Sequence, residues 1–217
     1  SITYNNQKEN WHYGINAMAQ TSEGHRFNAE NQTRRLRTYF RYGNQEGRTY
    51  RFSHILSYSD IGHPGFISNP AYRKSRRLSQ YYQLNGFYPL GNGHSMSHSI
   101  FINDFKTLYY HRDDSPEGYK DTIKTKYDDM TIGYRSEMLI TKFSQWILMI
   151  GSDIDWSKSE VSIFDSKYDT PTQISIGSFI QSKYSIGNGW SFGSGLRFDY
   201  RRSDPGGNFQ KRIFTNW

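Results

Sequence analysis

The feature that most constrains the fold of this chain is a two-residue period in its apolar side chains. In the clearest case, from Trp190 to Tyr200, apolar residues alternate with small or charged ones. Successive side chains of a strand point to opposite faces, so this period predicts a β-strand with one apolar and one polar face. The same pattern recurs at residues 11–19, 36–42, 50–58, 82–88, 130–134 and 174–180. With a stub at residues 2–4, a less regular segment at 95–110 and an alternating segment at 146–156, we expect about ten strands.

The links between these segments alternate in length. Short, turn-like links lie at residues 5–10, 43–48, 89–93, 137–145 and 185–189. Long polar links lie at residues 22–33, 60–77, 112–124 and 157–172, and a polar tail follows from Arg202. A Greek-key sandwich would mix its loop lengths, whereas an outer-membrane barrel has short periplasmic turns and long extracellular loops. The expected fold is therefore all-β, an antiparallel up-and-down transmembrane β-barrel.

A length check on residues 146–156 supports a membrane barrel. Its two tryptophans, Trp146 and Trp156, lie on one face. At about 3.3 Å per residue and a tilt of about 40°, they span roughly 25 Å, the height of the apolar band of such a barrel. Trp190 and Tyr200 repeat this spacing on another strand. No apolar run approaches the roughly 20 residues that a transmembrane helix requires, so a helical membrane protein is excluded.

If the apolar residues face lipid, their alternates face the barrel lumen. We expect four arginines to be lumen charges: Arg35, Arg37, Arg197 and Arg201. A lipid-facing Arg or Lys near the membrane midplane would lower the stability by about 2–4 kcal/mol. Charged residues must therefore occupy only the alternate positions that face the lumen. The chain has a net charge of +7, and a basic lumen suits anions or an inserted polar plug. Alternatively, each arginine pairs with a neighbouring carboxylate.

Basic and aromatic residues gather in the expected extracellular loops. The candidate ligand-binding residues are His63, Tyr72, Arg73, Arg76, Arg77, His111 and Arg112. Such a cluster could hold carboxylate, phosphate or a metal-chelate anion through charge-assisted hydrogen bonds. A basic rim that meets lipopolysaccharide phosphates is the alternative. We expect no nucleic-acid partner, because the positive charge is distributed by strand parity rather than gathered on one face.

Catalytic and metal-binding motifs are absent from the sequence. The chain has no cysteine, which excludes disulfides, thiolate metal sites and a cysteine nucleophile. No phosphate loop, Gly-x-Ser-x-Gly or His-Glu-x-x-His motif is present. The acidic pairs at 113–114, 128–129 and 153/155, with His111, could form a hydrolase at the rim, but carboxylates beside a basic lumen more often form ion pairs. We therefore expect no enzyme, no metal site and no resident cofactor.

Several segments resemble a known family. The run Gly195-Leu196-Arg197-Phe198-Asp199 resembles the G-L-R-aromatic-D strand of TonB-dependent outer-membrane receptors. Residues 57–68 resemble an extracellular loop with a Leu-Pro-Gly core in siderophore and ferric-citrate receptors, although His63 stands where leucine is usual. Residues 146–156 look like a mid-barrel strand of the same family.

The resemblance implies a protein of the Gram-negative outer membrane that imports a scarce ligand. The family's barrel has about 22 strands and is plugged by an N-terminal domain. Residues 1–217 would then be one partial β-barrel region without the plug, about ten strands of a larger barrel. The implied ligand is a ferric siderophore, a similar anionic chelate or haem. The implied partners are membrane lipid, lipopolysaccharide, the siderophore-like molecule and the TonB complex, reached through the missing plug region.

Two other functions fit the same strands. One is a self-contained ten-stranded outer-membrane barrel that acts as a rim hydrolase or an adhesin, because an even strand number near ten can close by itself. The other is a soluble β-rich module that binds glycans or nucleic acid through exposed tyrosines. The soluble module would be monodisperse without detergent, whereas either barrel would aggregate.

Overall fold

The structure is a computed structural model. It describes residues 1–25, 29–66, 69–113, 120–143, 145–164, 166–170, 172–187, 189–203 and 207–216. Within these ranges, the side chains of residues 64–66, 69–73, 111–113, 120–124, 142–143, 169, 187 and 207–216 lie outside the description. The part of the chain that the structure describes contains no helix long and apolar enough to cross a membrane.

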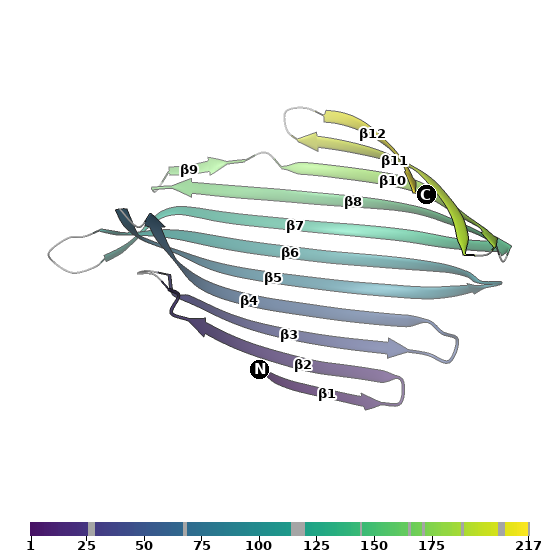
Figure 1. The fold of residues 1–217 in the computed structure, drawn as a ribbon, viewed down its shortest axis with the longest axis horizontal. Coiled ribbons are helices and arrows are strands. Elements are labelled where there is room, and N and C mark those ends of the chain that lie inside the picture. The colour runs from purple at the N-terminus through teal and green to yellow at the C-terminus, as the bar shows by residue number, and fades with distance from the viewer. Residues whose placement is uncertain are drawn as a thin grey trace.

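The described chain forms one antiparallel sheet in which strands that follow each other in sequence lie next to each other (Figure 1). The order is β1 to β8, then β10, β11 and β12, while the short β9 pairs only with β8. The strands are β1 (Ile2–Lys8), β2 (Trp11–Ser22), β3 (Asn31–Gly43), β4 (Thr49–Phe66), β5 (Asn69–Gly91), β6 (His94–Asp113), β7 (Lys120–Phe143), β8 (Trp146–Ile163), β9 (Ser166–Asp169), β10 (Gln173–Gly187), β11 (Trp190–Ser203) and β12 (Gly207–Asn216). This is the all-β, up-and-down arrangement that the sequence predicts.

The strand register separates apolar from polar side chains. Phe40 pairs with Phe52, which pairs with Leu84, so these residues share one face. In the adjacent row Arg41 pairs with Arg51 on the opposite face. We call the two surfaces the apolar face and the polar face. A one-residue slip would exchange them, so the match of all ladders to the sequence alternation fixes the register.

The apolar face is not covered by another layer of the described chain. Its large side chains stay exposed, as at Leu84 (48%), Ile150 (42%) and Ile176 (43%), and Tyr110 is the one apolar residue described as buried. A continuous apolar surface of this kind on a soluble monomer is an aggregation hazard. On a barrel wall, however, it is the surface that contacts lipid.

One end of the sheet, which we call the short-turn end, carries the links β1–β2, β3–β4, β5–β6, β7–β8 and β10–β11 (Figure 1). The other end, the long-link end, carries the remaining links, among them the two longest, β2–β3 and β6–β7. The turn between β5 and β6 has positive φ at Asn92 (52°) and Gly93 (78°). Two adjacent residues with positive φ are what a two-residue hairpin of type I′ requires, and Asn-Gly is its preferred sequence.

Aromatic side chains line the apolar face near the short-turn end. Ring centroids lie 4.4 Å apart for Trp11 and Tyr42, 6.4 Å for Tyr42 and Tyr50, and 5.7 Å for Tyr50 and Tyr88. These contacts cross four different strands. They form the kind of interfacial aromatic girdle that borders the apolar band of membrane barrels.

The segments expected as long loops are in part strands. Within the expected loop 60–77, residues 60–66 belong to β4 and residues 69–77 to β5. β8 runs on to Ile163, and the expected tail loop contains β12. β1 is also longer than the expected stub. Eleven strands therefore follow one another in the sheet, with β9 beside them, instead of about ten. Backbone pairing continues where both faces are polar, and there the two-residue period of the sequence disappears.

The sheet is open along its two outer strands. Among the described residues no ladder joins β1 to β12. The closed ten-stranded barrel of the alternative interpretation would need such a ladder, so it is not the arrangement that the described strands adopt.

Candidate functional site

A single cross-strand row carries the charge of the polar face across the sheet. Its members come from nine strands and are His12, Arg41, Arg51, Asn85, Ser99, Arg135, Asp153, Gly177 and Asp199. Basic residues occupy the β2–β4 end of this row, and acidic residues enter only from β8 onward. The polar face is thus divided into a purely basic half and a half of mixed charge.

The register places all four expected lumen arginines on the polar face. Arg35 and Arg37 lie on β3, in register with Ser57 and Ile55 of β4. Arg197 and Arg201 lie on β11, in register with Phe179 and Ser175 of β10. The alternation of the sequence therefore assigned the backbone positions of these four residues to the correct face of the sheet. That this face lines a lumen stays a prediction.

In the mixed half Arg197 is held by two carboxylates. Its two terminal nitrogens donate to the two oxygens of Asp153, each at 3.0 Å, and its Nε donates to Asp199 at 2.7 Å. Asp153 and Arg197 are two strands apart, so the guanidinium must cross β10. Gly177 permits this, because a Cβ there would lie 2.4 Å from Arg197 Nη2. For Arg197 the ion-pair alternative is the one that the structure shows.

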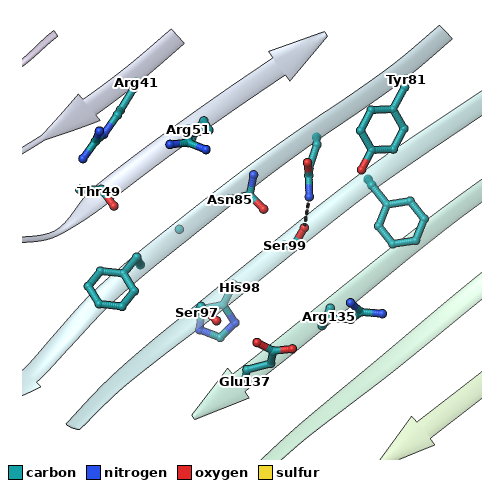
Figure 2. Close-up of a pocket in the computed structure, with 14 residues that line it drawn as sticks. Arg41, Thr49, Arg51, Tyr81, Asn85, Ser97, His98, Ser99, Arg135 and Glu137 are labelled. Carbon is teal, nitrogen blue, oxygen red and sulfur yellow. Dashed lines mark hydrogen bonds between the residues drawn. The ribbon is translucent and has the colours of Figure 1, made fainter. Parts of the chain in front are cut away.

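A groove runs from the basic half to β7 and is lined mainly by hydrogen-bond donors, with Glu137 as its one acidic residue (Figure 2). Arg41 and Arg51 lie side by side on β3 and β4, and Arg135 of β7 lies across the groove from them (Figure 2). Gln83 Nε2 donates to Ser99 Oγ at 3.1 Å on its floor. Sequence reasoning did not select Gln83 or Ser99, since neutral polar residues on a strand carry no signal without the register.

At the long-link end, the pairing brings several expected ligand contacts into one row. His63 of β4 pairs with Arg73 of β5, which pairs with His111 of β6. The His63 Nε2 lies 2.8 Å from Ser75 Oγ, and its ring lies 6.4 Å from that of Tyr109. The side chains of Arg73 and His111 lie outside the described residues, as do those of Tyr72 and Arg112. Sequence reasoning missed Ser75 and Tyr109.

Arg76 and Arg77 are adjacent in sequence but lie on opposite faces of β5. Arg76 pairs with Asp60 on the same side of the sheet as the apolar residues, and its Nε donates to Asp60 at 3.1 Å. Its guanidinium also lies 4.9 Å from the centre of the Tyr110 ring. The hydrogen bond that Arg76 donates to Asp60 is the main cause that raises the pKa of Arg76, and burial acts in the opposite direction. Arg77 lies over the Phe105 ring on the polar face, at 5.1 Å.

The apolar face carries ion pairs where its strands extend past their apolar residues toward the long-link end. Lys74 approaches Glu30 and Asp60, at 3.6 and 3.8 Å. On β8, Glu160 accepts from Lys158 at 2.6 Å and lies 3.0 Å from Lys167. These lysines, Lys158 first, lower the pKa of Glu160 to about 2. The long strands therefore change from an apolar to a charged surface, as a wall that leaves the membrane would.

The described residues contain no group of three or more His, Asp or Glu side chains that could hold a metal ion. Two histidines of β6 contact other protein groups through a ring nitrogen. His98 Nδ1 lies 2.6 Å from the Tyr134 hydroxyl, and His94 Nδ1 accepts from the backbone N–H of Thr141 at 3.0 Å. What the described site can do chemically is bind oxyanions through guanidinium groups.

No family model and no curated protein matches the chain. Solved structures do. The ferric preacinetobactin receptor BauA from Acinetobacter baumannii aligns with a TM-score of 0.71 and 8% identity, over 98% of this chain and 41% of that one. A chain in the FpvAI-pyocin S2 complex aligns with a TM-score of 0.66 and 10% identity, over 95% of this chain and 34% of that one. The chain therefore spans about two fifths or less of the length of these structures, and what it shares with them is the fold, the barrel-like antiparallel sheet of outer-membrane receptors.

Proposed function

We propose that this chain is part of the barrel of a TonB-dependent transport receptor in the outer membrane of a Gram-negative bacterium. The observation that carries the proposal is the sheet itself. It combines an uncovered apolar face, an arginine-rich polar face and, over 98% of the chain, a fold similar to that of the ferric preacinetobactin receptor BauA. A soluble module would have to cover this apolar face, whereas a membrane barrel leaves it to lipid.

The proposed ligand is a ferric siderophore or a similar anionic chelate, with haem as a related case. Guanidinium and imidazole groups at the long-link end would bind its oxygen atoms, and the arginines of the polar face would line its route inward. The support is the row of His63, Arg73 and His111 and the basic half of the polar face. The protein is a transporter in this proposal, neither an enzyme nor the holder of a resident cofactor.

The proposed partners follow from the position in the membrane. Lipid would contact the apolar face, and lipopolysaccharide phosphates would meet the lysines and arginines beyond the apolar band. Coupling to the TonB complex would run through a plug region supplied outside residues 1–217. The remaining strands of the barrel would extend the sheet at β1 and β12.

The proposal is tested by uptake of iron-55 carried by a panel of ferric chelates. Cells in which the gene is deleted should lose uptake of one chelate, and the intact gene should restore it. An uncoupler should abolish uptake and leave binding at the cell surface unchanged. The proposal fails if the native protein is found in the soluble fraction, or if deletion changes the uptake of no chelate.

Variants at the long-link end test the residues proposed to contact the ligand. Replacing Arg73, Arg76 and Arg77 together with Ala should weaken chelate binding, as should His63→Ala. Arg202→Ala removes a charge at the same end of β11 and serves as the matched control. Unchanged affinity and uptake in the triple variant would contradict this ligand site while leaving the receptor assignment intact.

A further inference from the structure

The basic half of the polar face lacks acidic side chains. In β1 to β5, the described polar-face positions hold Arg35, Arg37, Arg41, Arg51 and Arg77 and no Asp or Glu. The half from β7 to β11 contrasts with it, because there Arg197 shares two carboxylates. Charge on the polar face is therefore balanced on one side of the sheet and unbalanced on the other.

Arg41 and Arg51 form a like-charge pair in this unbalanced half. They are direct cross-strand partners, and His12 and Asn85 are their next neighbours in the row. Like charges directly opposite each other destabilise a sheet. Among the described residues no carboxylate forms an ion pair with either arginine. An anion bound from solution would offset the repulsion between the two guanidinium groups, because no carboxylate of the described sheet pairs with them.

The space around the pair has the size and lining of a small-molecule site. Two hollows, of about 590 and 650 Å³, share Arg41 and Arg51 as a common wall. Arg135 and Asn85 line the first, and Arg37 lines the second. Each guanidinium presents five N–H donors in a planar fork that matches carboxylate and phosphate oxygens. Glu137 is the one acidic residue among those that line either hollow.

We propose that Arg41 and Arg51 form the centre of an oxyanion site on the polar face, close to the short-turn end. The ligand is a small polyvalent anion that carries phosphate or carboxylate groups, bound between the two guanidinium groups and assisted by Arg37 and Arg135. This inference deepens the proposed function by giving the lumen a second anion site, far along the strands from the row of His63. The inference rests on the proposed function in one respect: the plugged barrel must keep a water-filled space at Arg41 and Arg51.

The test measures binding of pyrophosphate and inorganic phosphate to the full-length protein in detergent. Pyrophosphate should raise the midpoint of thermal unfolding, followed by tryptophan fluorescence, above its value in sodium chloride of equal ionic strength. Calorimetric titration should show that Arg41→Gln and Arg51→Gln each lose about tenfold or more in affinity, as expected for one bidentate charged contact. Because each variant removes the like-charge pair, neither should unfold earlier than the wild type in anion-free buffer.

Lys183→Gln is the matched control, because it removes one positive charge from the polar face of β10 near the same end. It should keep the wild-type affinity. The inference is overturned if sodium chloride at equal ionic strength produces the same shift, or if Lys183→Gln loses as much affinity as the Arg41 and Arg51 variants. Loss of chelate uptake with pyrophosphate binding intact would count against the transport function alone. Normal chelate uptake without pyrophosphate binding would count against this inference alone.

Discussion

Removal of the bridge between Arg197 and Asp153 is expected to destabilise the sheet by a measurable amount. The bridge consists of two parallel bonds of 3.0 Å, and the side chain of Asp153 is only 9% exposed. The Arg197 side chain is 28% exposed, so water screens part of the interaction. We therefore expect Arg197→Ala to lower the free energy of unfolding by about 1.5–3 kcal/mol, below the 3–5 kcal/mol of a fully buried pair.

The two partners of the bridge should not be equivalent. Arg197→Ala removes a donor that Asp153 and Asp199 share, and leaves the nearly buried Asp153 carboxylate without its guanidinium. Asp153→Ala leaves Arg197 bonded to Asp199 at 2.7 Å. The arginine variant should therefore be the less stable of the two. Gly177→Ala should also lower the stability, but by less, because the added Cβ would displace the Arg197 guanidinium from Asp153.

The assay is urea unfolding of the full-length protein in lipid vesicles, arranged as a double-mutant cycle. We expect a coupling energy of about 1–2 kcal/mol between positions 153 and 197. Lys183→Ala, on the same face, should change stability by no more than about 0.5 kcal/mol. If the effects of the two single changes add to within about 0.5 kcal/mol of the effect of the double variant, the bridge contributes no specific stability, contrary to this prediction.

Three further predictions concern the faces and ends of the sheet. Ile150→Arg, on the apolar face, should cost about 2–4 kcal/mol in vesicle unfolding, whereas Met149→Arg, on the polar face, should cost much less; equal costs would contradict the assignment of faces. Tyr110→Ala should cost about 2–4 kcal/mol, because it removes the one buried apolar side chain described and the ring beneath Arg76; a urea midpoint equal to that of the wild type would show that this contact is unimportant. The pKa of Glu160 is lowered to about 2 from an ordinary 4.5, so its contribution to stability is complete above pH 4.5 and lost as the pH falls toward 2. The protection factors of the β9 amides, which correct for the pH dependence of intrinsic exchange, should fall over that interval, and Glu160→Gln should remove this pH dependence.

The alternation of side chains was sufficient to find the strands that carry the apolar band. In β10 and β11 one face must be apolar and the other must not, so the two-residue period is complete in the sequence. Beyond Asp60 on β4, and throughout β12, both faces are polar or of mixed character, and the period vanishes although the backbone ladder continues. Strand ends outside the band could not be predicted for this physical reason.

The sequence alone predicted on which face of the sheet each expected lumen arginine lies, but not which residue it contacts. Parity alone assigned Arg37 and Arg197 to the polar side. It could not show that Arg197 reaches across Gly177 to Asp153, two strands away, while Arg41 meets another arginine. Those outcomes depend on the register between strands, which the turns set and which a single strand does not contain. The same register separates Arg76 from its neighbours in sequence by pairing it with Asp60.

If the apolar face contacts lipid and the polar face contacts water, accessibility to lipid and to water must alternate from residue to residue along one strand. The chain has no cysteine, so a single cysteine can be introduced at each position from 147 to 155 of β8 and given a spin label in vesicles. We expect collision with oxygen, which dissolves in lipid, to be frequent at even positions and rare at odd ones, and collision with a water-soluble nickel complex to show the reverse. Equal accessibility at successive positions, or the opposite phase, would contradict the membrane barrel.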